Sequence, residues 1–306
     1  MKYLVTGGAG FIGSYITKHL VNHGDSVVVL DNLYTGKKKN LADIENKIEF
    51  IDGDIRDFKL LESIMKNTKG VFHQAALASV PESYTIPEKY DDVNVNGTEN
   101  IFKLAKQFGL KVVYASSSSV YGNPKNIPMK ESDEIKPINP YAKTKADKEK
   151  LAIKYSGMGV DIIGLRYFNV YGIGQSKEYA GVIKLFLEQI RDKLPPNVNG
   201  DGTQFRDFVH VSDVVKANIL SMDSNVPNGF FNVGTNSSIT VLDLAKLVIE
   251  HAGLDIKPVF RPALKGDVHK SLCNNQLIRE KIGWTPTINL EDWLKEIITL
   301  NKIDEV

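Results

Sequence analysis

Short apolar runs rich in β-branched residues alternate with amphipathic stretches through the first half of the chain. Apolar strands separated by helices are typical of βαβ units, in which a parallel sheet is buried on both faces. We therefore expect an α/β protein with a doubly wound parallel sheet and right-handed crossovers. The pattern predicts strands at 3–5, 26–30, 48–51, 70–73, 111–115 and 161–165, and helices at 11–23, 58–67, 91–108 and from about 141.

The second half of the chain is less regular, with clusters of Gly and Pro at 194–197 and 200–202. Such clusters favour turns and loops over regular elements. Two helices are still predicted there, one of which follows Thr240 and the other covers 290–300. Thr240 with Asp243 resembles a capping box, which marks the start of a helix.

The length of 306 residues exceeds a usual single domain of about 100–150 residues, so we expect two lobes. The first lobe is predicted to cover 1–171, with segments near 209–215 and 230–250 that return to it. The second, covering 172–306, is predicted to be a smaller C-terminal α/β lobe.

Composition excludes several classes of protein. Lys and Arg total 38 against 37 Asp and Glu, and a net charge of +1 gives no field that would attract nucleic acid or an anionic membrane. Cys273 is the single cysteine, which excludes an internal disulfide and fits a reducing compartment. No apolar run approaches the ~20 residues of a membrane span. The apolar N-terminus is interrupted by glycines at once, so we interpret it as the first strand of a cytoplasmic enzyme.

The first candidate site is the glycine-rich segment Gly7–Gly13, between a predicted strand and the helix from Phe11. Glycines allow a pyrophosphate to approach bare backbone, and the helix N-terminus offers N–H groups to it. Asp31 closes the second predicted strand, where a carboxylate would bind an adenosine ribose and disfavour a 2′-phosphate. NAD is therefore favoured over NADP, although Lys37–Lys39 weaken that argument. The alternative is a Gly-rich turn with a helix-capping aspartate.

The second candidate site is Tyr141 with Lys145, which lie four positions apart and so share one face of a helix. An adjacent ammonium favours the phenolate and would lower the pKa of the phenol from its usual ~10. A stray tyrosine on a surface helix is the alternative. The serine-rich loop Ser116–Ser119 favours the catalytic interpretation, because it follows a strand whose carboxyl end lies at the expected site.

Motifs along nearly the whole chain carry a resemblance to the extended short-chain dehydrogenase/reductases, and most closely to the UDP-hexose 4-epimerases. The motifs are Thr6–Gly13, Asp31-Asn32, Gly53–Asp57, His73–Ala76, Asn94–Thr98, Ser117 with Tyr141 and Lys145, Arg166–Gly172, Arg206–Val211, Gly266-Asp267 and Ile282–Pro286. The resemblance implies a Rossmann-type NAD-binding first lobe, a mainly nucleotide-sugar-binding second lobe, and a homodimer joined by helices near 91–108 and 141–156.

The resemblance also implies a reaction and its residues. Tyr141 would take the proton of the sugar 4-hydroxyl while hydride passes to NAD, and the transient 4-keto sugar would take the hydride back on its other face. Ser117 would bind the same oxygen, and Lys145 the ribose. Implied cofactor residues are Gly7, Gly10, Phe11, Ile12, Gly13, Asp31, Asn32, Gly36, Asp54, Ile55, Ala75, Ala76, Asn94, Ser116, Tyr141, Lys145 and Phe168. Implied substrate residues are Ser79, Ser83, Ser117, Tyr141, Asn169, Val182, Arg206, Phe208, Lys265, Asp267 and Ser271.

Several alternatives stay open at this point. A nucleotide-sugar 4,6-dehydratase would carry Asp-Glu where this chain has Ser118-Ser119, and a non-catalytic NAD-sensing regulator would commonly lose the Tyr/Lys pair. The segment 79–83 and the small Ser271 suggest room for an N-acetylated sugar as well as UDP-glucose. Leu264 stands where relatives carry a diphosphate-binding arginine, and Arg261 or Lys265 is a candidate replacement.

Other titratable residues suggest no further chemistry. His19 and His23 have a spacing that can bind zinc, but no third ligand is identifiable, so we expect no metal. Cys273 is interpreted as a packed or unreactive thiol. The lysines at 143, 148, 150 and 154 alternate with Asp147 and Glu149, which predicts a solvated helix face.

Overall fold

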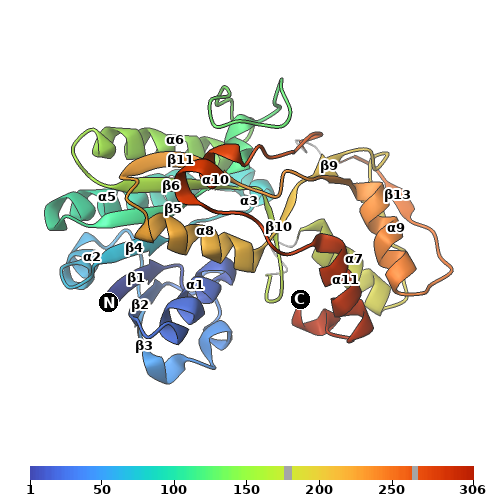
Figure 1. Ribbon diagram of the computed structural model, residues 1–306, viewed down its shortest axis with the longest axis horizontal. Helices are drawn as coiled ribbons and strands as arrows, with labels where there is room; N and C mark the ends of the chain where they lie inside the picture. The colour runs from blue at the N-terminus through green and yellow to red at the C-terminus, as the bar shows by residue number, and fades with distance from the viewer. Residues whose placement is uncertain (176–180, 264–267) are drawn as a thin grey trace.

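The computed structural model describes residues 1–175, 181–263 and 268–306. Figure 1 shows a layered α/β body and, beside it, a smaller group of elements that includes α7, α9, α11 and β13. The C-terminus lies in the smaller group and the N-terminus in the larger one (Figure 1). Within the described residues, no helix has the length and apolar character needed to cross a bilayer.

The larger body is built on a seven-stranded sheet in the order β11-β6-β5-β4-β1-β2-β3, and every pairing in it is parallel. The expected doubly wound sheet is confirmed. The strand order reverses between β1 and β4, and ligands of such sheets bind at this switch point, beyond the carboxyl ends of the strands. The strands are β1 Lys2–Thr6, β2 Ser26–Asp31, β3 Ile48–Asp52, β4 Gly70–His73, β5 Lys111–Ser117, β6 Ile162–Tyr167 and β11 Asn228–Val233.

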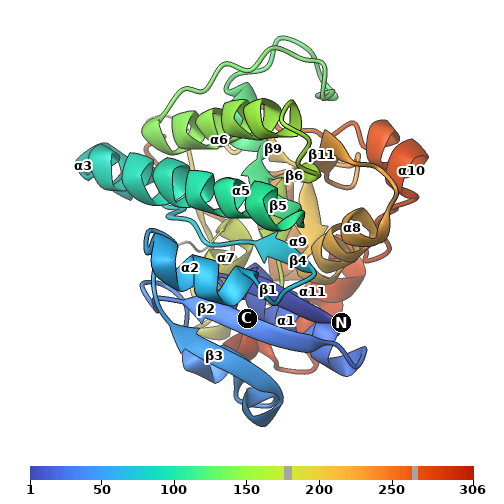
Figure 2. The same ribbon diagram turned by 90° about the vertical axis from the view of Figure 1, so that its left-hand side faces the viewer.

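Helices cover both faces of this sheet, because the strands are apolar on both sides. On one face, α1 (Phe11–Asn22), α8 (Val211–Asp223) and α10 (Gln276–Ile282) bury their apolar side chains against the sheet. On the other, α2 (Phe58–Met65), α5 (Gly97–Phe108) and α6 (Pro140–Ser156) do the same. Figure 2 shows the two groups of helices on opposite sides of the strands.

The predicted helix at 91–108 differs from the observed one. It begins earlier, with α4 (Pro87–Tyr90), passes through a π-type turn at Asp91–Asn96, and continues as α5. The turn carries Asn94, whose buried amide binds the backbone of Leu77 on the neighbouring loop. The wider helical turn therefore lies at the residue whose side chain fixes the Leu77 loop, which forms part of the wall of the site described below.

The smaller group of elements packs around its own apolar cluster, which includes Phe186, Leu244 and Leu294. The helix expected after Thr240 is present, and the Thr240 hydroxyl accepts a hydrogen bond from the Asp243 N–H at 3.0 Å. The helices are α7 Val182–Arg191, α9 Val241–His251 and α11 Leu290–Thr299. The short strands pair as β7 Asn169–Tyr171 with β10 Phe208–His210, β8 Asn197–Asn199 with β13 Val259–Arg261, and β9 Phe205–Arg206 with β12 Ile239–Thr240.

The remaining elements are short. Helix α3 follows β4 after a loop at 74–79, and the single-turn segments lie in other loops. They are α3 Val80–Thr85 and the 3₁₀ turns Lys38–Leu41, Glu45–Lys47, Ser118–Tyr121 and Ile303–Glu305. The division into lobes at residue 171 stays a prediction.

Candidate functional site

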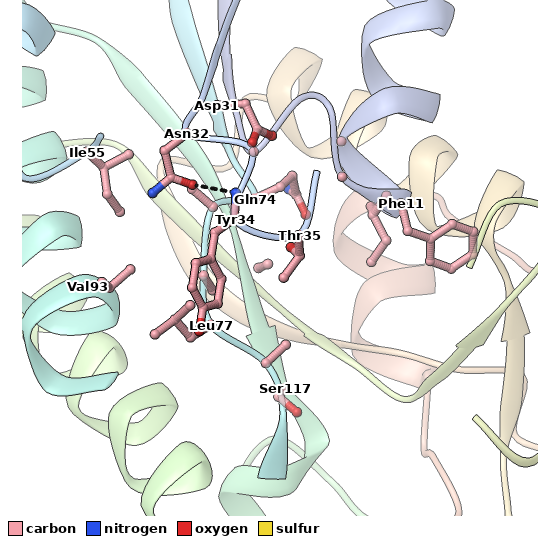
Figure 3. Close-up of a pocket in the computed structure, with 18 of the residues that line it drawn as sticks. Phe11, Asp31, Asn32, Tyr34, Thr35, Ile55, Gln74, Leu77, Val93 and Ser117 are labelled. Atoms are coloured by element: carbon pink, nitrogen blue, oxygen red, sulfur yellow. Dashed lines mark hydrogen bonds between the residues drawn. The ribbon is translucent and has the colours of Figure 1, made fainter. Parts of the chain in front are cut away.

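A cavity of about 400 Å³ opens beyond the carboxyl ends of β1, β2, β4 and β5, at the switch point of the sheet. Figure 3 shows its wall, with Asp31 and Asn32 at one end and Ser117 at the other. Sixteen of the predicted residues line it: Gly7, Gly10, Phe11, Ile12, Gly13, Asp31, Asn32, Asp54, Ile55, Ala75, Ala76, Ser116, Ser117, Tyr141, Lys145 and Phe168. The structure therefore brings both candidate sites of the sequence into one cavity.

The glycine-rich loop joins β1 to α1 along one wall of the cavity. A Cβ at Gly13 would overlap the carbonyl oxygen of Gly7, so the close packing of loop and helix requires glycine. No side chain caps the N-terminus of α1. Its first N–H groups and the positive end of its dipole therefore suit a phosphate group.

Asp31 lies buried at the end of β2, with both carboxylate oxygens fixed by the backbone. One accepts from the N–H of Ala9 at 2.9 Å and the other from the N–H of Leu33 at 2.8 Å. Burial raises the pKa of Asp31, and these backbone hydrogen bonds oppose the rise. Gly36 does not line the cavity; a Cβ there would lie 2.6 Å from a carboxylate oxygen of Asp31, so its contribution is close packing behind the acid.

The residues present fit a dinucleotide such as NAD. Bare backbone lies beside a helix N-terminus for the pyrophosphate, and a fixed carboxylate stands where the adenosine ribose of such cofactors lies. Apolar side chains of Ile55, Leu77 and Val93 form a wall near Asn32 that suits a purine ring (Figure 3).

Tyr141 and Lys145 project into the cavity from the first turns of α6. The helix starts where the Asn139 side chain accepts from the Ala142 N–H at 2.8 Å. The Lys145 Nζ donates to the carbonyl oxygen of Ala115 at 3.0 Å and lies 5.6 Å from the centroid of the Tyr141 ring. The two side chains therefore share one helix face at neighbouring positions, as the spacing predicts.

The predicted effect of Lys145 on the phenol is wrong for this structure. Burial raises the pKa of Tyr141, and only a hydrogen bond with Ser117 opposes the rise. Burial also lowers the pKa of Lys145 to about 8. Desolvation outweighs the attraction between the two groups because Lys145 is buried and Tyr141 is partly buried. The phenol is therefore a proton donor at neutral pH until further positive charge comes near it.

Ser117 is held in place from its own loop. Its Oγ accepts from the N–H of Ser119 at 3.2 Å, and its hydroxyl hydrogen can then be donated to Tyr141. Behind it, the Ser116 hydroxyl donates to Glu149 at 2.6 Å, and Glu149 forms a buried ion pair with Arg166 at 2.8 Å. The serine loop is thereby fixed to both α6 and β6.

The prediction of a solvated face on α6 is wrong for two of its residues. Lys143, Lys150 and Lys154 are exposed, whereas Lys148 is fully buried, with its Nζ 5.4 Å from the centroid of the Tyr114 ring. Glu149 is also buried, in the ion pair with Arg166. The helix lies against the sheet, so its alternating charges do not all face water.

A second cavity, of about 370 Å³, adjoins the first, and Val170 and Gln175 line both. Four predicted substrate residues line it: Asn169, Val182, Arg206 and Phe208. The Arg206 guanidinium donates to the carbonyl oxygen of Phe205 at 2.9 Å. Amide side chains line it as well, among them those of Asn197, Asn199 and Gln204. A cation among amides suits an anionic, hydrogen-bonding ligand.

Several predicted residues do not line either cavity. The Asn94 amide is used on the Leu77 backbone, at 2.8 Å and 3.0 Å. Ser79 caps α3 by accepting from the Glu82 N–H at 3.2 Å, and the Ser83 hydroxyl donates to the Val80 carbonyl at 2.6 Å. These corrections share a cause, because short polar side chains often bind nearby backbone. Ser271 is buried outside both cavities, and Lys265 and Asp267 lie outside the described residues.

The cavity also contains residues that are not among the predicted site residues, including Tyr34, Thr35, Gln74, Leu77 and Lys89. Gln74 belongs to the motif His73–Ala76, and Leu77 is the residue directly after that motif. Tyr34 and Lys89 had no signal in spacing or composition, because they meet only through the fold.

Comparisons with known proteins agree with this geometry. The model of the NAD dependent epimerase/dehydratase family matches residues 3–234. The chain is 38% identical over 304 residues to a putative UDP-glucose 4-epimerase of Methanocaldococcus jannaschii, covering 98% of each chain. The UDP-glucose 4-epimerase of Thermotoga maritima, solved with UDP-glucose, is 36% identical, with a TM-score of 0.93 and 99% of each chain covered.

A further solved structure has the same TM-score of 0.93. It is the UDP-N-acetylglucosamine 4-epimerase of Methanobrevibacter ruminantium in complex with UDP-N-acetylmuramic acid, 36% identical, with 99% of this chain and 98% of that one covered. The family model spans the sheet, the glycine-rich loop and the Tyr141–Lys145 pair. The chain therefore belongs to the NAD dependent epimerase/dehydratase family.

Proposed function

We propose that the protein is an NAD-dependent epimerase that inverts C4 of a UDP-hexose. The observation that carries the proposal is that Ser117, Tyr141 and Lys145 line the same cavity as Asp31 and the glycine-rich loop. A cavity lined by Arg206 adjoins it. Similar proteins that are named UDP-glucose 4-epimerases, matched over nearly their whole length, support the choice of reaction.

Each residue has a part in the proposed chemistry. Bound NAD supplies a reversible acceptor for the hydrogen on the sugar carbon. The Ser117 hydroxyl, positioned by the Ser119 N–H, hydrogen-bonds the sugar 4-oxygen. Tyr141 takes the proton from that oxygen and returns it later. The Lys145 ammonium holds the cofactor ribose and stabilises the phenolate while it exists.

The proton on Tyr141 depends on the charge around it. The pKa of the phenol is raised by burial, so the phenolate forms only where nearby cations outweigh desolvation. Lys145 and the positive ring of oxidised NAD are the two cations that the proposed complex would place there. Tyr141 would therefore act as a base only in the enzyme that has NAD bound.

The second cavity is the proposed site for the UDP group. Arg206 would pair with the diphosphate, and the amides of Asn169, Asn197 and Asn199 would bind polar edges of the nucleotide. The similar UDP-N-acetylglucosamine 4-epimerase supports the N-acetylated sugars as candidate substrates beside UDP-glucose and UDP-galactose. Dehydration is not favoured, because Ser118 and Ser119 offer hydroxyls where an acid and a base are needed.

Three broader expectations belong to this proposal. The first lobe would bind NAD and the second mainly the nucleotide sugar, with the boundary at 171. The enzyme would act in the cytoplasm as a homodimer joined through α5 and α6. Exposed Ile153, in the last turn of α6, and Met158, in the turn after it, support that surface. A single monomeric species in sedimentation would exclude the dimer.

Incubation of the purified protein with UDP-galactose and, separately, UDP-N-acetylgalactosamine tests the reaction. Proton NMR of the sugar region should show the corresponding gluco epimer in at least one mixture. A product that has lost water would point to a dehydratase instead. Unchanged sugars in both mixtures, with NAD demonstrably bound, would refute the epimerase proposal.

A further inference from the structure

The ring of Tyr34 extends across one end of the first cavity. Its backbone belongs to the loop after β2, where its N–H donates to the Asn32 side chain at 3.1 Å. Figure 3 shows the ring directed from Asn32 toward the segment that carries Leu77. Because Asp31 marks the position of an adenosine ribose, this is the adenosine end of the dinucleotide site.

The far side of the ring is attached to a different part of the fold. The Tyr34 hydroxyl donates to one carboxylate oxygen of Glu82, on α3, at 2.6 Å. The other oxygen of Glu82 lies 2.8 Å from the hydroxyl of the fully buried Tyr90, which shares its hydrogen between this oxygen and the carbonyl oxygen of Ser79 at 2.7 Å. Glu82 is therefore anchored in the core, and Tyr34 joins the β2 loop to that anchor.

A second contact holds the Tyr34 ring. The Lys89 Nζ, from α4, lies 4.0 Å from the centroid of the ring, which is within cation–π distance. Tyr34 and Lys89 both line the cavity, and Tyr34 is 46% exposed, so its other side faces solvent. The Tyr34 side chain therefore lies between the cavity and solvent and is held at both ends. In this position it closes an opening of the cavity.

We propose that Tyr34, Glu82 and Lys89 form a clasp that retains the adenosine end of NAD. The proposal rests on the dinucleotide site and not on which sugar is turned over. A cofactor behind the ring can leave only after the Tyr34–Glu82 hydrogen bond breaks and the ring swings away from Lys89. The clasp should therefore act mainly on the rate of NAD dissociation, because the ring must move before the cofactor can leave.

The test is the rate at which NADH leaves the loaded protein, followed by loss of its bound fluorescence during a chase with excess NAD. Tyr34→Phe keeps the ring and removes only the hydroxyl. Loss of one hydrogen bond to a partly exposed carboxylate should speed release about tenfold. Lys89→Met should speed it by a few-fold, because the cation–π contact is weaker than the hydrogen bond.

Two comparisons make the result decisive. Tyr84→Phe on α3 is the matched control, because Tyr84 is 53% exposed and does not line the cavity; its release rate should be unchanged. Glu82→Gln should speed release, and the Tyr34→Phe/Glu82→Gln pair should release no faster than the faster single variant. Wild-type release from Tyr34→Phe, or fully additive effects in the pair, would overturn the clasp whatever the protein does with UDP-sugars.

Discussion

The Nζ of Lys148 lies 3.5 Å from Nε2 of His73, and both side chains are fully buried between α6 and the sheet. Both ring nitrogens of His73 already form hydrogen bonds with hydroxyls, Nδ1 with that of Thr6 at 2.7 Å and Nε2 with that of Thr98 at 2.9 Å. In the described part of the chain no carboxylate lies within salt-bridge distance of Lys148. Burial lowers the pKa of both Lys148 and His73, and the fold therefore disfavours the charged form of an amine beneath the active-site helix.

Lys148→Met should stabilise the protein. In the unfolded chain this lysine carries a proton up to about pH 10.4, whereas burial favours the neutral amine in the folded state. Unfolding then takes up a proton, so the penalty is largest at acidic and neutral pH and fades as the pH approaches about 10. We expect a melting temperature several degrees higher than wild type at neutral pH and a smaller gain at high pH. An equal gain at every pH would show that packing alone is responsible.

The affinity for NAD should fall above about pH 8. The pKa of Lys145 is lowered to about 8, and its ammonium is the proposed partner of the cofactor ribose. Above that pH the free protein must take up a proton to bind, which raises Kd by up to about tenfold per pH unit. Calorimetric titrations across this range measure the effect. Lys145→Met should bind NAD more weakly with a flatter profile, and a flat wild-type profile would contradict the role.

Tyr141→Phe should leave NAD bound and reduce epimerisation by about 10²–10⁴-fold, the usual contribution of a positioned acid or base. The ring still fills its place on α6, so melting temperature and cofactor content should stay close to wild type. The readout is the rate of sugar conversion in protein with matched NAD content. Turnover at the wild-type rate would remove Tyr141 as the base.

Glu149→Gln should destabilise the fold by about 3–5 kcal/mol, because it leaves the buried Arg166 guanidinium without its counter-charge. Denaturant unfolding measures the loss. Asp147→Asn is the matched control on the same helix. Its partners Lys143 and Lys150 have side chains 62% and 75% exposed, so the cost should stay below about 1 kcal/mol. Equal losses in the two variants would show that the burial of Glu149 does not matter.

The sheet could be predicted because its strands have a local signal. Continuous apolar runs such as Val27–Leu30 and Val112–Ala115 have no solvated face, which is the mark of a doubly covered parallel strand. Helices α7 and α8 were not predicted, α7 because Gly- and Pro-rich turns lie beside it, and α8 because its buried residues include the polar Asp213, Asn218 and Ser221. Their place is decided by packing against α9 and α1 instead.

The site was predictable where chemistry requires a residue type and not where packing decides. The glycine-rich loop, Asp31 and the Tyr141–Lys145 pair have the residue types that phosphate binding, ribose binding and proton transfer require. Lys148 was misread because its sequence neighbours are surface lysines, and burial depends on which strand α6 covers. Tyr34 is the reverse case, an aromatic in a loop whose role depends on a partner 48 positions away.

The parallel pairing of β11 with β6 sets how the chain can be divided. The last strand of the larger sheet comes from Asn228–Val233, whereas its neighbour ends at Tyr167, and the intervening chain builds much of the other lobe. A single cleavage of the chain between β6 and β11 would leave two fragments that both contribute strands to the larger sheet. Expression of the first 171 residues alone would uncover an apolar strand edge that invites self-association.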